Sequence, residues 1–174
     1  MRLWLLRHAK SSWQDDELPD IERPLAPRGR RAADAIARYI ARESIRPELV
    51  LCSPAARARE TLERVLPSLG DPDVGVEPEL YTFDPEPLLL RLRSIPDRVG
   101  SVMLVGHNPA IQRLALTIAR GGDRRAELAA SYPTGALAEL ELEARTWSDA
   151  GVADAALTRF VLPRRLVADE RRRP

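Results

Sequence analysis

The feature that most constrains the fold is an unbroken apolar run, Leu3–Leu6, close to the start of the chain. In a strand, neighbouring side chains point to opposite faces of the sheet, so a run that is apolar throughout needs burial on both faces. Such a strand belongs in the middle of a sheet. We therefore expect Leu3–Leu6 to form a buried central strand.

Further apolar runs alternate with patterns that are typical of helices. Strand patterns occur in six segments: 3–6, 49–52, 74–76, 101–105, 136–142 and 156–162. In the last two, apolar and polar residues alternate, and we expect these two strands to pair antiparallel. Helical spacing occupies four others: 28–42, about 53–66, 85–94 and one that starts at Asn108-Pro109 and ends before Gly121. This order predicts an α/β domain, and the intervening helices favour parallel pairing of the early strands.

Two of these helices have a polar residue followed by proline at their expected start, at Ser53-Pro54 and Asn108-Pro109. A serine or asparagine oxygen can accept a hydrogen bond from the first turn, and proline fits the first helical position. We therefore expect Ser53 and Asn108 to cap these helices. Residues 10–26 are polar and interrupted by prolines, which predicts a loop.

The chain has no internal repeat and no linker that would divide it, so we expect a single domain over residues 1–163. Its 174 residues suffice for one domain with a hydrophobic core. Residues 164–174 are rich in arginine, and we expect them to form a frayed C-terminal tail.

Charge and composition argue against several classes of partner. The net charge is +1, so no overall field attracts nucleic acid or an anionic membrane. No segment approaches the roughly 20 apolar residues that span a bilayer, and the first apolar run is too short for the core of a signal peptide. No heptad pattern stands out. We expect a cytoplasmic monomer without a nucleic-acid or membrane partner.

Polar, reactive side chains follow three of the expected parallel strands. They are Arg7-His8, then Ser53 with Arg57 one helical turn later, and Gly106-His107-Asn108. In α/β sheets, ligands bind beyond the carboxyl ends of the strands, where helix N-termini also point. The only two histidines of the chain and two arginines are therefore expected at one pocket.

This set of side chains suits phosphoryl chemistry better than metal binding. Arginine offers paired donors that match a phosphate, and histidine can attack phosphorus or donate a hydrogen bond. Two histidines are too few for a metal site, the single Cys52 adds no thiolate cluster, and neighbouring arginines repel a cation. From the sequence pattern alone, an equally good interpretation is that each histidine is a structural capping group at the end of its strand and belongs to no functional site.

Three ordered blocks resemble the histidine phosphatase superfamily, named for its Arg-His-Gly motif. Residues 6–14, Leu-Arg-His-Ala-Lys-Ser-Ser-Trp-Gln, resemble its phosphate-binding opening, with Ala9 in place of the usual glycine. Residues 53–61 resemble the second block and residues 105–109 the third. The turn at residues 23–29, Arg-Pro-Leu-Ala-Pro-Arg-Gly, is also similar, and the likeness extends from residue 2 to about 143.

Within the superfamily, the short chain and its opening look like the SixA branch of protein phosphohistidine phosphatases. The resemblance implies a phosphoglycerate-mutase-like fold, in which helices flank a mixed, mostly parallel sheet in three layers. It implies that His8 is the nucleophile, that Arg7, Arg57 and His107 bind the phosphoryl group, and that no cofactor or metal takes part. The substrate would be a phosphorylated protein. The alternatives are a phosphatase of small metabolites such as sugar phosphates, and a non-catalytic phosphate-binding regulatory module.

The resemblance also raises the question of a proton donor. Some relatives place a carboxylate directly after the second histidine, where this chain has Asn108, and others place it after the third sheet segment. Glu79 is the candidate proton donor that would follow the third sheet segment, and Asp84 is the alternative candidate. Each of them also fits the interpretation of an ordinary surface carboxylate. Gln14 and Thr134 are candidate substrate contacts by the same resemblance, and a solvated loop residue is an equal interpretation of Gln14.

Overall fold

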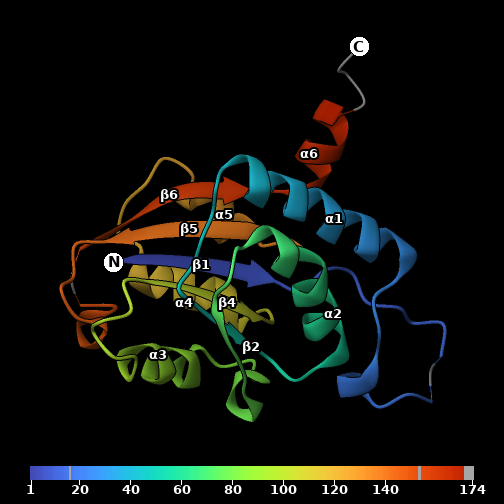
Figure 1. Ribbon diagram of the computed structural model, residues 1–174, viewed down its shortest axis with the longest axis horizontal. Coiled ribbons are helices and arrows are strands. Elements are labelled where there is room, and N and C mark those ends of the chain that lie inside the picture. The colour runs from blue at the N-terminus through green and yellow to red at the C-terminus, as the bar shows by residue number, and fades with distance from the viewer. Residues whose placement is uncertain (16, 153, 171–174) are drawn as a thin grey trace.

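The computed structural model describes residues 1–15, 17–152 and 154–170 (Figure 1). Within them lies one mixed sheet of six strands in the order β3-β2-β4-β1-β5-β6. The strands are β1 (Arg2–Arg7), β2 (Leu49–Cys52), β3 (Asp73–Val76), β4 (Ser101–Gly106), β5 (Leu137–Leu142) and β6 (Ala155–Val161). The pairs β1–β4, β4–β2 and β2–β3 are parallel, whereas β1–β5 and β5–β6 are antiparallel. The predicted α/β fold with a mostly parallel sheet is confirmed.

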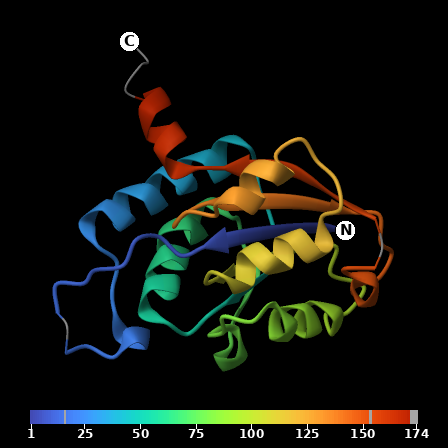
Figure 2. The same cartoon turned by 180° about the vertical axis from the view of Figure 1, so that it is seen from behind.

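Helices cover both faces of this sheet (Figures 1 and 2). One face carries α1 (Pro27–Arg42) and α2 (Ala56–Val65), and the other carries α3 (Pro85–Arg93), α4 (Ala110–Ile118) and α5 (Arg125–Ala130). The last helix, α6 (Pro163–Glu170), packs against α1 and points away from the body of the molecule. Short 3₁₀ helices interrupt the loops: η1 (Asp20–Glu22), η2 (Leu66–Ser68), η3 (Pro78–Leu80) and η4 (Trp147–Asp149).

The two-residue period of β1 explains the three layers. Leu3 and Leu5 belong to the apolar cluster shared with α3 and α4, whereas Trp4 and Leu6 belong to the cluster shared with α1 and α2. All four side chains are almost completely buried. Each contributes roughly 1.5–3 kcal/mol by leaving water, so β1 stabilises the packing of both helical layers. The expected central strand is confirmed.

Two helices near the C-terminus differ from the sequence predictions. The six residues of α5 bury only Leu128, which is too weak a periodicity to predict a helix. Residues 164–170 belong to α6, where we predicted a frayed tail; residues 171–174 lie outside the described residues. Proline suits the first position of a helix, and Leu166 packs on the cluster between α1, α2 and the sheet, which offsets the entropy of ordering this segment.

The predicted capping roles of Ser53 and Asn108 are wrong. The helices begin later, at Ala56 and Ala110, and no side chain caps either one. The Ser53 hydroxyl instead lies 2.7 Å from Nε2 of His107 and accepts only a long bond of 3.4 Å from Ala55 N–H, ahead of the helix. The Asn108 amide donates to Gln112 Oε1 at 3.1 Å and to the carbonyl of Tyr132 at 3.3 Å, next to a cis Asn108-Pro109 peptide. The partners that these side chains take in place of the helix N–H groups are the imidazole of His107 for Ser53, and a glutamine side chain and a distant carbonyl for Asn108.

The loop after β1 returns to the start of α1 and lies tightly against it. The N–H of Ala26 donates to the carbonyl of Lys10 at 2.9 Å. A Cβ atom added to Gly29, inside α1, would lie 2.1 Å from that same carbonyl oxygen. Gly29 is therefore required because the backbone that leads out of the site approaches the helix more closely than any side chain permits.

Replacing Gly29 with alanine is expected to destabilise the protein by up to about 2 kcal/mol. Moving the Lys10 backbone to relieve the overlap costs up to about 3 kcal/mol, and the roughly 1 kcal/mol by which alanine is favoured over glycine in a helix offsets part of this cost. Urea denaturation measures the difference. Gly121→Ala is the control, since nothing lies within 4 Å of its Cβ position. Equal stability of the Gly29→Ala and wild-type proteins would contradict this account.

Candidate active site

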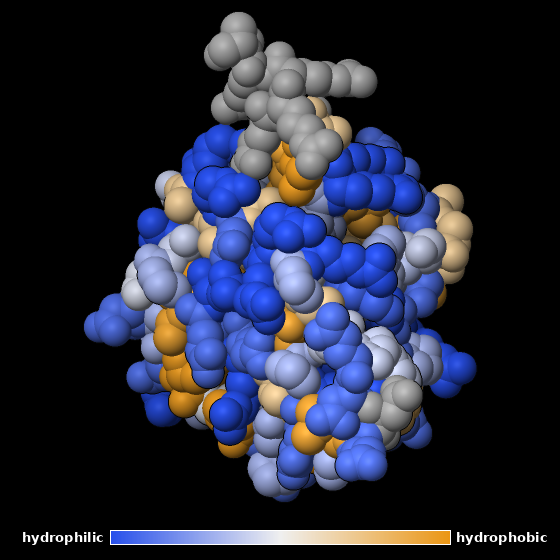
Figure 3. Space-filling view, turned by 90° about the vertical axis from the view of Figure 1, so that its right-hand side faces the viewer, coloured by the Kyte–Doolittle hydropathy of each residue, from blue (hydrophilic) through white to orange (hydrophobic). Residues whose placement is uncertain are grey.

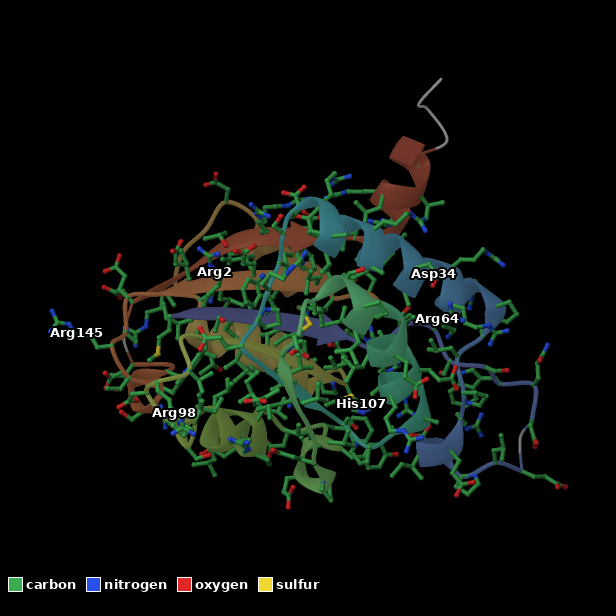
Figure 4. The ribbon with its side chains drawn as sticks, in the orientation of Figure 1. Arg2, Asp34, Arg64, Arg98, His107 and Arg145 are labelled. Atoms are coloured by element: carbon green, nitrogen blue, oxygen red, sulfur yellow. The ribbon has the colours of Figure 1, made fainter. Side chains whose placement is uncertain are left out.

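The carboxyl ends of β1, β4 and β2 meet at one edge of the sheet. His8 follows the last residue of β1, and His107 follows the last residue of β4. Their rings are 5.0 Å apart between centroids and are inclined by 50°. Figure 4 shows His107 in this place, and Figure 3 shows that the end of the molecule toward which β1 points is largely hydrophilic. The structure thus brings together two histidines that are far apart in the sequence.

A pocket of about 210 Å³ surrounds the two rings. It is lined by Arg7, His8, Lys10, Ser11, Trp13, Asp20, Arg57, Phe83, His107, Asn108 and Thr134. Five of the predicted site residues are in this set: His8, Arg7, Arg57, His107 and Thr134. Trp13 is exposed at the rim, and the guanidinium of Arg23 lies 4.1 Å from its ring centre.

His8 is held with one nitrogen ready for attack. Its Nδ1 lies 2.7 Å from the carbonyl oxygen of Ala9. A carbonyl can only accept, so Nδ1 carries the hydrogen of the neutral ring and Nε2 keeps its lone pair. The N–H of Ala9 in turn donates to Thr61 Oγ1, which donates to the carbonyl of Arg57, so the loop is tied to α2. Nε2 is the only ring nitrogen that can act as a nucleophile.

Both imidazoles are neutral at neutral pH. The pKa of His8 is lowered to about 4, chiefly by burial; the bond to Ala9 opposes this effect, and Arg57 and Arg7 add to it. Burial also lowers the pKa of His107 to about 3, with contributions from His8 and Arg57. A protonated ring would lose its hydration and lie beside cations, so the neutral form is favoured.

His107 is oriented by a buried hydroxyl. Its Nε2 bonds Ser53 Oγ at 2.7 Å, and Ser53 is completely buried. Nδ1 is also buried and has no partner among the described residues. When Ser53 donates to Nε2, Nδ1 carries the hydrogen and is a free donor for a ligand. Ser53 is therefore a positioning residue for His107.

Arg57 projects from the first turn of α2 and is held by the loop before α1. It donates to both the main-chain carbonyl and the carboxylate of Asp20, the latter at 2.8 Å, and Tyr81 OH donates to the same carboxylate oxygen at 2.7 Å. The Tyr81 bond and then Arg57 lower the pKa of Asp20, so this carboxylate is ionised at neutral pH. The guanidinium of Arg57 is thereby fixed in position at the pocket.

Asp20 and Tyr81 were missed by the sequence analysis. Asp20 lies in the polar loop of residues 10–26, which has no periodicity, and Tyr81 follows η3, some sixty residues later. The only local hint is the Arg23-Pro24-Leu25 turn near Asp20, which returns this loop to the site. The contact of Arg57 with both residues arises from long-range packing.

Arg7 and Asn108 also have unpaired polar atoms at the pocket. Arg7 donates from Nη1 to the Tyr132 carbonyl at 2.6 Å, whereas its Nε and the Oδ1 of Asn108 are buried without a partner in the described chain. Two donors, Arg7 Nε and the protonated His107 Nδ1, and one acceptor, Asn108 Oδ1, thus belong to residues that line one cavity and have no hydrogen-bond partner in the described chain. Unpaired buried polar groups cost about 1–3 kcal/mol each, so a bound polar ligand would be stabilised here.

Thr134 reaches the pocket through a tight turn. Gly135 has a φ of +76°, which favours glycine, and its N–H donates to the carbonyls of Arg7 and His8 at 3.1 and 3.0 Å. This turn brings Thr134 to the rim, as the resemblance implied.

The structure does not place three of the candidate residues, Gln14, Glu79 and Asp84, in the lining of the pocket. Gln14 and Glu79 are exposed and are not among the residues that line the pocket, so their expected contact with a substrate stays a prediction. Asp84 accepts a hydrogen bond from Glu86 N–H at 3.1 Å and caps α3. The 3₁₀ turn of η3 presents Tyr81 to Asp20, whereas Glu79 stays at the surface.

Within the described ranges, no three histidine, cysteine, aspartate or glutamate side chains are grouped as a metal site would require. None of the helices in the same ranges is long and apolar enough to cross a membrane.

Comparisons with known proteins agree with this geometry. The profile of the histidine phosphatase superfamily, branch 1, matches residues 3–84. An uncharacterized protein of Mycobacterium leprae is 34% identical over 91% of this chain and 100% of its own length. The chain belongs to the histidine phosphatase superfamily. The matched segment contains His8, Arg57 and all of β1 except Arg2, and His107 lies beyond it.

Two solved structures of superfamily members are similar over nearly the whole chain. The candidate phosphohistidine phosphatase SixA of Agrobacterium tumefaciens has a TM-score of 0.77 and 34% identity, covering 93% of this chain and 97% of its own. The protein histidine phosphatase SixA in complex with tungstate has a TM-score of 0.78 and 25% identity, covering 95% and 99%. These likenesses confirm the fold that the resemblance implied.

The neutral state of the imidazoles can be observed directly by NMR, since the chain has only two histidines. In the folded protein, neither ring should titrate between about pH 8 and about pH 5.5, because both pKa values lie well below the ordinary 6.5. In urea, both should titrate near the ordinary value. A His107→Gln variant assigns the two signals. A folded-state midpoint near 6.5 for His8 would contradict the electrostatic account of this site.

Proposed function

We propose that this protein is a cofactor-independent phosphatase that transfers a phosphoryl group to His8 and then to water, and that its substrate is a phosphohistidine on another protein. Three features of the site support the phosphatase chemistry. His8 Nε2 has a free lone pair, the half-buried Arg7 and the buried Arg57 line the same pocket, and His107 Nδ1 is an unused hydrogen-bonding group. A ring of cationic and neutral donors is the expected environment for a phosphoryl group in transfer.

The first step forms a bond between Nε2 of His8 and phosphorus, while the bond from phosphorus to the leaving nitrogen breaks. The leaving nitrogen keeps the bonding electron pair; a proton on the other ring nitrogen of the substrate makes the departing imidazole neutral. In the second step, the oxygen of water attacks phosphorus and the electron pair returns to Nε2. Inorganic phosphate leaves and one proton goes to solvent. Arg7, Arg57 and His107 would hold the phosphoryl oxygens in both steps.

The lack of a proton donor at the site is the observation that favours phosphohistidine. Among the described residues that line the pocket, Asp20 is the only carboxylate, and its lowered pKa keeps it ionised. Asn108, where some relatives have an acid, offers only an amide. An alcohol leaving group needs a proton from the enzyme, whereas a protonated phosphoimidazole leaves without one. The site therefore suits a labile phosphoramidate better than a stable phosphate ester.

The similar structures support the same class of ligand. The protein histidine phosphatase SixA was solved in complex with tungstate, an oxyanion that resembles phosphate, and the Agrobacterium tumefaciens structure bears the name of a phosphohistidine phosphatase. By that likeness, the partner of this chain would be a phosphorylated protein.

The covalent step is tested by trapping the phosphoenzyme. Incubation with a radiolabelled histidine-phosphorylated protein and rapid denaturation should yield labelled enzyme whose label is lost in acid and kept in base. The His8→Ala variant should carry no label and show no turnover. Label that survives acid, or turnover by His8→Ala, would overturn the proposed mechanism. Binding of phosphate without any label would indicate a non-catalytic module.

Substrate class is tested by comparing kcat/KM on the phosphorylated protein and on glucose 6-phosphate. We expect a preference of at least about a hundredfold for the phosphoramidate, because none of the described residues that line the pocket is a protonated carboxylic acid that could protonate a sugar oxygen; general acid catalysis typically contributes 10²–10⁴-fold. Equal rates on both substrates would favour a phosphatase of small metabolites.

Arg57→Lys should lower kcat/KM by about 10²–10³-fold, a magnitude typical of losing one donor to the transition state. Lysine keeps the charge but cannot donate to both Asp20 oxygens and to a phosphoryl oxygen with a fixed planar geometry. Steady-state kinetics on the phosphorylated protein measure the effect. Arg59→Lys, an exposed position on the same helix, is the matched control and should keep wild-type kinetics. Similar kinetics for both variants would contradict the role of Arg57.

A further inference from the structure

A second, larger hollow adjoins the catalytic pocket. Its volume is about 910 Å³, and it shares Arg7, Lys10 and Thr134 with the pocket that contains the histidines. The other residues that line it come from the first turns of α1, from the turn before β5 and from α6: Arg28, Arg31, Ala32, Pro133, Leu162, Pro163, Arg164, Val167 and Ala168. We call this hollow the α1–α6 groove. A ligand could therefore occupy the groove and the pocket together.

The walls of the α1–α6 groove are apolar in the middle and basic at the rim. Ala32 and Val167 are half-buried on facing helices, and Pro163 is buried between them. Arg28 and Arg31 are exposed on the α1 side, and Arg164 is exposed on the α6 side. Figure 1 shows α6 rising at an angle from α1. The residues that line the groove come from both of these helices. This arrangement suits a segment that carries both apolar and acidic side chains.

Among the side chains that the structure describes, in residues 1–15, 17–152 and 154–168, the positive charge at this rim has no partner of opposite sign. No ion pair or hydrogen bond of these side chains joins Lys10, Arg28, Arg31 or Arg164 to a carboxylate, and none of the groove's lining residues is acidic. Elsewhere arginines are paired, as Arg64 is with Asp34 at 2.6 Å. An uncompensated cluster of one sign attracts ligands of the opposite sign and raises their local concentration.

The two cavities differ in volume and in the groups that they contain, which indicates different roles. The pocket of about 210 Å³ holds the reacting groups, whereas the groove of about 910 Å³ lies beside them and contains no group that the chemistry needs apart from the shared residues. An apolar strip with cationic edges would bind the chain next to a phosphorylated residue. A free sugar phosphate has no apolar side chains to place on Val167 or Pro163.

We propose that the α1–α6 groove docks an acidic, amphipathic segment of the phosphorylated protein, adjacent to the phosphohistidine that reacts at His8. The proposal rests on the proposed function. Leucine- or isoleucine-like side chains of the segment would pack on the apolar strip, and its carboxylates would pair with Arg28, Arg31 and Arg164. The groove thus selects among phosphoproteins and leaves the chemical step to the pocket.

The test uses the double variant Arg28→Glu/Arg31→Glu. The matched control is Arg98→Glu/Arg145→Glu, which makes the same change in net charge at two exposed arginines far from the groove (Figure 4). The substrates are two synthetic phosphohistidine peptides of equal length, one flanked by glutamate and leucine and the other by lysine and leucine, together with free phosphoramidate. The measurement is kcat/KM for each enzyme and substrate at low and high salt.

The wild-type protein should prefer the acidic peptide by roughly tenfold or more, and high salt should reduce the preference. The groove variant should lose this preference, with the change mainly in KM, while the control variant keeps it. All three proteins should hydrolyse phosphoramidate equally, which also shows that the variants are folded. Arg164→Glu, on the opposite wall, should weaken the preference in the same direction.

Two results would overturn the docking proposal while the proposed function stands. One is turnover of phosphoramidate without any preference between the peptides. The other is an equal loss of preference in the groove and control variants, which would show that net charge alone is responsible. Failure of the wild-type protein to hydrolyse phosphoramidate and both peptides would overturn the proposed function and the docking proposal together.

Discussion

The parallel pairing of β1 with β4 is the interaction on which the site depends. In this register Arg7 lies opposite Gly106, and the N–H of His8 donates to the carbonyl of Gly106 at 3.0 Å. Both strands end at the same edge, so the residues that follow them are neighbours whatever their separation in sequence. A slip of one residue would turn every β1 side chain to the other face and move Leu3 and Leu5 out of their cluster. Burial of the two cores therefore also determines the position of the histidines.

Burial and charge act together at this edge. The same low-polarity surroundings that stabilise the sheet keep His8 and His107 neutral, and the arginines add to this effect. The site thus combines neutral imidazoles, which can attack or donate, with permanent cations, which can hold an anion. Asp20 supplies the opposite charge to Arg57 at the half-exposed rim, where its carboxylate stays ionised. The basic α1–α6 groove extends this positive region away from the reacting groups.

The strands, the main helices and the main residues of the candidate site were predictable because each follows from a local signal. Leu3–Leu6 is apolar throughout, residues 28–42 have helical spacing, and His8, Arg57 and His107 lie at or near strand ends. The role of Ser53 was not predictable from the same kind of signal. A serine before proline is typical of a helix cap, and only the packing of β2 beside β4 places its hydroxyl next to His107.

The sequence by itself determined that this chain forms layered helices around a central strand, with two histidines after apolar runs. These properties depend on the spacing of apolar residues and on neighbours within a few positions. Only the tertiary structure decided that Asp20 and Tyr81 hold Arg57, that Glu79 stays at the surface and that α6 forms a groove with α1. Those contacts join residues that are far apart in the chain, and their energies depend on burial and distance in three dimensions, which local spacing does not encode.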